Sequence, residues 1–106
     1  MIKVVINTCY GGFGLSKSAC ELYAERKNLQ LGTWSETWGF FEGGDFYDRE
    51  IPRDDSVLVS IVEEMGKDSF GNYSELRVVE VPEDADWYID EYDGKEWVAE
   101  THRTWG

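Results

Sequence analysis

Two pairs of turn-forming residues, Gly43-Gly44 and Asp93-Gly94, constrain the fold of this chain more than any other feature. Pairs of this kind form two-residue turns, and such turns connect neighbouring antiparallel strands. Stretches rich in aromatic and β-branched residues lie on both sides of each pair. The predicted strands are residues 34–40 and 46–51 around the first turn, and residues 87–92 and 95–101 around the second. We therefore expect two β-hairpins, and the register of the first would pair Phe41 with Phe46.

Two more strands and two helices are predicted from the spacing of apolar residues. Alternation predicts a strand over residues 2–7, buried mainly on one side, and another over residues 76–81. Each helix is marked by a polar residue that caps its first turn and by a residue that ends it. The caps are Ser16 for the first helix and Asp54 or Asp55 for the second, and the ends are Asn28 and Gly66.

The resulting element order is βαββαβββ, which lacks the regular alternation of strand and helix that builds a doubly wound parallel sheet. We expect an α+β fold with an antiparallel or mixed sheet and two helices packed on one face. The chain of 106 residues, with 42% apolar and 15% aromatic residues, is long enough for one hydrophobic core. Residues 1–106 are therefore expected to form a single domain.

The charge of the chain is strongly acidic and unevenly distributed. It has 22 acidic and 10 basic residues, a net charge of −12. Residues 1–32 carry four basic and two acidic residues, so the remaining residues hold a net charge of −14. Such a field repels nucleic acids and anionic membranes and favours basic partners. The alternative is that the acidity only keeps a small protein in solution.

The cysteines and the N-terminus indicate a cytosolic protein. Cys9 and Cys20 are the only cysteines, and we expect both to be free thiols rather than a disulfide. Met1 leads directly into the first predicted strand without the features of a secretory signal, and no apolar run approaches the length of a membrane span.

A glycine-rich segment precedes the first predicted helix. Residues 11–18 differ from the phosphate-binding G-x-x-x-x-G-K-[ST] pattern at one position, where Ser16 replaces the second glycine, so nucleotide hydrolysis is not expected. Glycines before a helix N-terminus can still bind a phosphate or carboxylate through backbone N–H groups. The candidate anion-binding residues here are Gly11, Gly12, Gly14, Ser16 and Lys17. The alternative is that the glycines only allow a tight connection.

A basic and aromatic cluster, His102, Arg103 and Trp105, ends the acidic chain and is a second candidate for anion binding. An arginine and a tryptophan can clamp a phosphate or stack on a base. The alternative is that Trp105 anchors the C-terminus on the core while Arg103 pairs with neighbouring carboxylates.

The last predicted hairpin is crowded with carboxylates. A two-residue turn at Asp93-Gly94 places Glu91 opposite Glu96, a like-charged pair that destabilises a hairpin unless a cation relieves it. The candidate partner-binding acidic residues are Asp86, Asp90, Glu91, Asp93, Glu96 and Glu100. A solvated face is the alternative. The sequence lacks the carboxylate spacing of a metal-binding loop, and it has no second histidine. It therefore predicts no metal, no cofactor and no catalytic site.

Two segments, residues 3–16 (KVVINTCYGGFGLS) and residues 86–105, resemble a family of small uncharacterised proteins of tailed bacteriophages and prophages. Residues 51–55 and the helix after them are also similar. The resemblance implies no known activity and no functional residues. It implies a small phage accessory protein in the host bacterial cytoplasm, where such proteins commonly act on host defence by stoichiometric binding.

The leading hypothesis is therefore a non-catalytic counter-defence protein. It would occupy a host protein with a basic surface, as an acidic mimic of nucleic acid, or sequester a nucleotide-like signal, with dimerisation a further possibility. The alternative is a small phosphate-handling or nucleotide-modifying enzyme that uses Lys17 and His102. Cys9 and His102 could also be written as a nucleophile and its base, but nothing in the sequence places them together.

Overall fold

The computed structural model of the protein describes residues 1–100. Its elements follow the predicted order βαββαβββ, with two short 3-10 turns, η1 and η2, on either side of the second helix. The strands are β1 (Ile2–Asn7), β2 (Leu31–Ser35), β3 (Phe40–Gly44), β4 (Leu76–Val81), β5 (Trp87–Tyr92) and β6 (Lys95–Glu100). The helices are α1 (Lys17–Lys27) and α2 (Ser56–Met65), and the 3-10 turns are η1 (Asp48–Glu50) and η2 (Gly66–Ser69). The predicted α+β class is confirmed.

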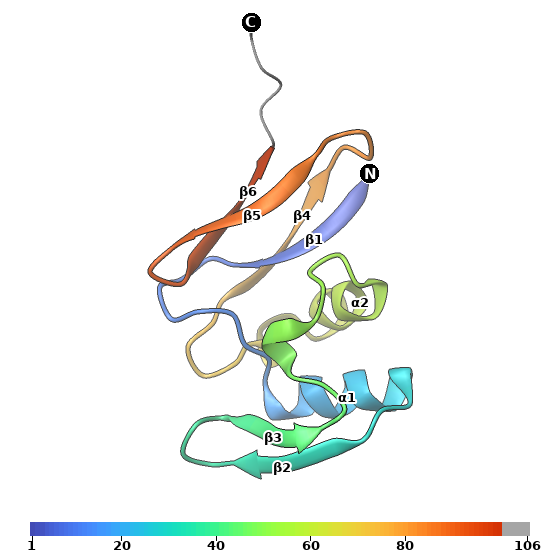
Figure 1. The fold of residues 1–106 in the computed structure, drawn as a ribbon, viewed down its shortest axis with the longest axis vertical. Coiled ribbons are helices and arrows are strands. Elements are labelled where there is room, and N and C mark those ends of the chain that lie inside the picture. Colours follow the sequence, from blue (N-terminus) through green and yellow to red (C-terminus); the bar gives the residue numbers. More distant parts are fainter. Residues whose placement is uncertain (101–106) are drawn as a thin grey trace, which may run out of the picture.

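All strand pairs are antiparallel, but they form three two-stranded sheets, β1–β4, β2–β3 and β5–β6, rather than one continuous sheet. Figure 1 shows these sheets as layers along the long axis of the molecule, with α2 and α1 between the β1–β4 pair and the β2–β3 pair. Helix α2 contacts β1 and β4, while α1 contacts α2 and β2. Both helices thus lie on the same side of the β1–β4 pair, with α2 in contact with that pair and α1 packed between α2 and the β2–β3 pair. Together they connect two separate strand pairs.

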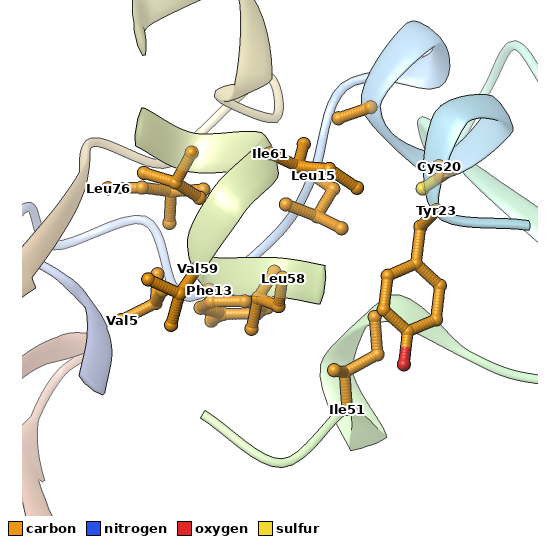
Figure 2. Packing of buried hydrophobic residues seen from close by; sticks show 12 residues of the cluster. Val5, Phe13, Leu15, Cys20, Tyr23, Ile51, Leu58, Val59, Ile61 and Leu76 are labelled. Atoms are coloured by element: carbon orange, nitrogen blue, oxygen red, sulfur yellow. The ribbon is translucent and has the colours of Figure 1, made fainter. Parts of the chain in front are cut away.

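Strand β1 is buried on both faces, so the prediction of one-sided burial is wrong. Val5 belongs to the larger core cluster, formed with α1, α2 and the loops around them (Figure 2). Val4 and Ile6 point to the other face, where they pack with Val81 and with apolar residues of the β5–β6 hairpin. Helix α2 and the larger core cover the face of β1 that carries Val5, which the alternating pattern assigned to solvent, because alternation cannot reveal a layer that comes from elsewhere in the chain.

Both predicted helices and their ends are confirmed. The Ser16 hydroxyl accepts a hydrogen bond from the Ala19 N–H at 3.1 Å, and Asn28 ends α1 in the left-handed conformation with φ of 56°. Asp55, one of the two predicted caps, accepts hydrogen bonds from two N–H groups in the first turn of α2, and Gly66 ends that helix. No helix within residues 1–100 is long and apolar enough to cross a membrane.

The first predicted hairpin, residues 34–40 paired with residues 46–51, is wrong, because the hairpin of this region is formed by β2 and β3 instead. The turn lies at residues 36–39, and Phe41 pairs with Trp34 instead of Phe46. Gly43 and Gly44 have positive φ angles of 77° and 83°, but they lie at the end of β3 rather than in a turn. A Cβ at Gly44 would lie 2.5 Å from the backbone nitrogen of Gly32. Gly44 therefore permits close approach to the neighbouring strand, and the segment after it forms η1 instead of a strand.

The second predicted hairpin is confirmed in its register. Asp93 and Gly94 have φ angles of 52° and 91°, as a two-residue turn with two left-handed residues requires. Tyr92 pairs with Lys95, and Glu91 pairs with Glu96. The strand after the turn extends to Glu100 within the described residues.

Candidate functional site

The glycine-rich loop after β1 is held by Asn7, the buried last residue of that strand. The Asn7 side-chain amide donates to the carbonyl oxygens of Cys9 and Gly94, both at 2.8 Å, and its carbonyl oxygen accepts from the Glu75 N–H at 2.8 Å. The Asn7 backbone N–H donates to Glu96 Oε1 at 2.8 Å. One side chain thus joins the start of the loop to the β5–β6 turn and to the segment before β4.

The loop is also packed closely against the segment before β4. A Cβ at Gly11 would overlap with the backbone of Tyr73, so this position cannot accept a larger residue without movement. Further along, Gly71 donates its N–H to the Gly14 carbonyl oxygen at 3.0 Å. At Gly11 the structure therefore supports the alternative interpretation, in which the glycines only permit a tight connection.

A buried ion pair between Arg53 and Glu96 forms the wall beside the loop. The guanidinium binds the carboxylate in bidentate fashion, with Arg53 Nη2 and Glu96 Oε2 at 2.9 Å. The side chains are only 16% and 8% exposed. Arg53 also lies over the ring of Phe13, 3.7 Å from Cζ to the ring centroid. The repulsion expected between Glu91 and Glu96 is thus relieved inside the molecule, by an arginine of the same chain.

A second arginine, Arg49, is placed beside the loop by its neighbour Asp48. The buried Asp48 carboxylate accepts hydrogen bonds from the Leu15 N–H at 2.9 Å and from the Arg49 N–H at 3.0 Å. These bonds tie η1 to the loop and leave the Arg49 side chain exposed next to it. Within residues 1–100, Arg49 forms no ion pair with an acidic group.

Together these segments surround a hollow with a volume of about 290 Å³, which we call the loop hollow. Its lining residues are Gly11, Gly12, Phe13, Arg49, Arg53, Glu91 and Glu96. A second, smaller hollow lies next to it, shares Gly11, Gly12, Phe13 and Arg49, and adds the exposed rings of Trp38 and Tyr73.

The predicted anion-binding residues divide between these hollows and other places. Gly11 and Gly12 line the loop hollow, and Gly14 lines only its neighbour. Ser16 lines neither hollow, since its hydroxyl caps α1 and donates to the Asp68 carbonyl oxygen at 2.6 Å. The Lys17 ammonium lies over the Trp34 ring instead, at 5.9 Å from its centroid. The cations that line the loop hollow are Arg49 and Arg53, and the Lys95 ammonium lies over the Tyr10 ring of the same loop, 5.5 Å from its centroid.

Sequence reasoning missed Asn7, Asp48, Arg49 and Arg53. Their partners are far away in the sequence: 89 positions separate Asn7 from Glu96, and 43 separate Arg53 from Glu96. One signal was available. A glutamate predicted to lie opposite another glutamate requires a cation, and the few arginines of an acidic chain were the residues to test.

His102, Arg103 and Trp105 lie outside the described residues, so the predicted C-terminal cluster and the Cys9/His102 pair have no geometry here. The described thiols are both free. The Cys9 thiol donates to the Tyr73 carbonyl oxygen at 3.0 Å. Burial, with the carboxylates of Asp48 and Glu21 adding to it, raises the pKa of the Cys20 thiol to about 12. That thiol is therefore protonated at neutral pH and a poor nucleophile.

The predicted acidic patch lies on the β5–β6 hairpin, but one member is not on the surface. Asp86, Asp90, Glu91, Asp93 and Glu100 are exposed, whereas Glu96 is buried in its pair with Arg53. Each exposed carboxylate is thus available to a partner, and Glu96 instead holds the hairpin on the rest of the molecule.

The same hairpin presents aromatic rings that sequence reasoning did not include in the patch. Trp87, Ile89 and Val98 pack against the β1–β4 pair. Because side chains alternate along a strand, the residues between them point to the opposite face. We call this the outer hairpin face; it carries Tyr88, Asp90, Tyr92, Lys95, Trp97 and Ala99. Tyr88, Tyr92 and Trp97 are 48%, 71% and 43% exposed. Alternation within residues 87–92 was the signal that could have identified it.

Among residues 1–100, no group of three or more histidine, cysteine, aspartate or glutamate side chains is arranged to hold a metal ion. The described surface thus presents two features, an aromatic outer hairpin face with exposed carboxylates beside it and a loop hollow lined by two arginines. Comparison of the chain with protein-family models, with curated proteins and with solved structures finds no match in any of the three.

Proposed function

We propose that this protein acts by non-catalytic, stoichiometric binding of a basic protein surface through the outer hairpin face. One observation carries the proposal: exposed Tyr88, Tyr92 and Trp97 share a small hairpin with five exposed carboxylates. Asp90 and Trp97 are direct cross-strand partners on that face, so an acidic and an aromatic group are presented side by side.

The two kinds of side chain contribute in different ways. Tyrosine and tryptophan are the residues that most often supply binding energy at protein interfaces, because they bury a large area at a small cost in conformational entropy. Exposed carboxylates contribute mainly to the association rate and to the choice of a basic partner. The face would therefore bind through its rings, while Asp90 and the exposed carboxylates beside the face would select a basic partner.

The biological setting of the proposal comes from the resemblance to small phage and prophage proteins. In that setting the protein acts in the host bacterial cytoplasm, and the basic partner is a host defence protein whose nucleic-acid groove the carboxylates occupy in place of phosphates. Infection of bacteria that carry individual defence systems, by phage with and without this gene, tests the setting. If the gene changes plating on none of the strains, the counter-defence role is wrong, whatever the protein binds.

Binding itself is tested by capture from a bacterial lysate with two variants of equal charge change, Asp90→Lys and Glu21→Lys. Asp90 lies on the outer hairpin face, whereas Glu21 is exposed on α1. We expect Asp90→Lys, and separately Trp97→Ser, to abolish capture of the basic partner, and Glu21→Lys to retain it. Raising NaCl from about 0.05 to 0.5 M should weaken capture by the wild type strongly, since it shortens the screening length. Capture that is insensitive to both salt and Asp90→Lys would rule out this surface.

A further inference from the structure

We propose that the loop hollow and the smaller hollow beside it together bind a nucleoside phosphate, with the phosphate at Arg49 and the glycine-rich loop and the base on Trp38 and Tyr73. This site is separate from the outer hairpin face and would take a ligand of the opposite charge. It also differs from the site predicted around Ser16 and Lys17, because neither residue lines the hollows.

The arginines give the loop hollow its anion-binding groups. Arg53 is fixed by its bidentate pair with Glu96 and by stacking on Phe13. It therefore shapes the wall, and its charge is largely balanced. Arg49 is exposed and forms no ion pair with another group of residues 1–100. An arginine without a carboxylate partner, in a chain of net charge −12, is suited to bind a phosphate through two parallel hydrogen bonds.

The loop itself contributes donors. Gly11, Gly12 and Phe13 line the hollow. The Gly12 nitrogen is packed against the β5–β6 turn, 2.7 Å from where a Cβ at Gly94 would lie, so we assign the N–H groups of Gly11 and Phe13 as the donors to the phosphate. Successive backbone N–H groups in a glycine-rich turn form concave sites for anions. The loop is kept in place by Asn7 and by the contact between Gly11 and Tyr73, so these donors are already ordered before a ligand arrives.

The aromatic part of the site lies on the other side of the same loop. Trp38 and Tyr73 line the smaller hollow and are 68% and 75% exposed. Trp38 is in the turn between β2 and β3, and the next residue, Gly39, touches Asn72, so the turn reaches the segment that carries Tyr73. Exposed rings beside an arginine are the arrangement on which proteins stack nucleobases.

One lining group opposes an anion. Glu91 faces the loop hollow and is exposed, so its carboxylate repels a phosphate at Arg49. Replacing Glu91 by glutamine should therefore tighten binding of a nucleotide, while the same change would weaken binding of a basic protein to the hairpin. The opposite signs distinguish failure of this proposal from failure of the proposed function.

Calorimetry and quenching of tryptophan fluorescence with ADP, GDP, CDP and UDP test the site, with adenosine and inorganic pyrophosphate as partial ligands. We expect at least one nucleotide to bind more tightly than either partial ligand. Arg49→Ala should weaken that binding about tenfold or more, the loss expected for one charge-assisted bidentate contact. Arg77→Ala is the matched control, because Arg77 is an exposed arginine on β4 that lines neither hollow. Trp38→Ser should weaken nucleotide binding and leave pyrophosphate binding unchanged.

Three results would overturn the proposal: no heat with any of the four nucleotides, equal affinity for pyrophosphate and nucleotide, or an Arg49→Ala variant that binds like the wild type. Circular dichroism of each variant checks that the fold is retained. Since Arg49 and Trp38 are exposed side chains, both substitutions should leave it intact.

Discussion

At the scale of single residues, the molecule depends on polar groups that are buried with their partners. Asn7 satisfies its whole side-chain amide with backbone groups from three segments, and Glu96 takes both Arg53 and the Asn7 N–H. Within residues 1–100 no buried side-chain nitrogen or oxygen is left without a hydrogen-bond partner. A charge buried in this way contributes little net stability by itself, but removing its partner is costly because the remaining charge stays out of water.

Arg53→Ala should therefore destabilise the protein by about 3–5 kcal/mol, because it leaves the Glu96 carboxylate buried without a cation. Arg26→Ala is the matched control: Arg26 also forms a bidentate pair, with Glu64 at 2.7 and 3.0 Å, but on the surface. Its loss should be much smaller, since water solvates the Glu64 carboxylate left behind. Urea unfolding of the two variants measures the difference. Equal losses would mean that burial of the Arg53–Glu96 pair does not matter.

Contacts between residues close together in the sequence could be predicted, and contacts between residues far apart in the sequence could not. The register that sets Glu91 against Glu96 was predicted, because a two-residue turn fixes it locally. The relief of that pair by Arg53 was not, because nothing local connects η1 and the loop after it to the hairpin. Likewise, the sequence pattern associated Lys17 with Gly11 and Gly12 because it lies close to them along the chain, whereas in the structure its ammonium lies over Trp34 and the hollow at these glycines is lined by arginines from another segment.

At the scale of elements, helix α2 begins at a residue that does more than cap it. Asp55 accepts hydrogen bonds from Val57 and Leu58 N–H groups and from the Tyr23 hydroxyl, and its carboxylate pairs with Lys27 at 3.2 Å. Burial alone would raise the pKa of Asp55, but the hydrogen bonds from Leu58, Lys27 and Tyr23 outweigh it and lower that pKa. The cap thus also fastens α2 to α1, which carries Tyr23 and Lys27.

The variants Asp55→Asn and Asp55→Ala should separate the stability that Asp55 provides as a helix cap from the stability that its negative charge provides. Asparagine is a good N-cap, so the asparagine variant keeps the cap, whereas alanine should lose about 1 kcal/mol more at neutral pH. Because the pKa of Asp55 is lowered in the folded state by its hydrogen bonds, its contribution is present above the unfolded pKa and is lost as pH falls through the folded pKa. Both variants should show a shallower loss of stability between about pH 5 and 2 than the wild type. Unfolding followed across that range measures it, and parallel acid profiles for wild type and variants would contradict the lowered pKa.

The elements also show what local patterns can predict. Helix ends were correct because Ser16, Asn28, Asp55 and Gly66 act within one turn of the chain. The first hairpin was wrong because Gly43-Gly44 has the composition of a turn, although Gly44 serves a close approach to Gly32 across the strand pair. A glycine required by a neighbouring backbone and a glycine required by a turn cannot be told apart from one sequence.

At the scale of the whole molecule, carboxylates gather in the hairpin region, and two of them, Glu91 and Glu96, line the loop hollow together with Arg49 and Arg53. The outer hairpin face and the acidic residues beside it concentrate negative charge at one end, while Arg49 and Arg53 lie at the junction of the glycine-rich loop, η1 and the hairpin. A net charge of −12 on 106 residues lowers the stability of the compact state through self-repulsion. Retaining that charge is understandable if a basic partner relieves it, which links the stability of the free protein to the proposed function.

Salt should therefore stabilise the free protein, because it screens repulsion among exposed carboxylates. Raising NaCl from about 0.02 to 0.3 M should raise Tm by a few degrees, on the order of what 1 kcal/mol produces in a domain of this size. The triple variant Asp86→Asn, Asp90→Asn, Glu100→Gln, which neutralises three exposed groups of the hairpin region, should melt higher than the wild type at low salt and respond less to NaCl. Thermal melts of both proteins at both salt concentrations measure the effect. If the wild type melts at the same temperature throughout, the carboxylates do not strain the free molecule, and relief of repulsion can no longer be a reason for binding a basic partner.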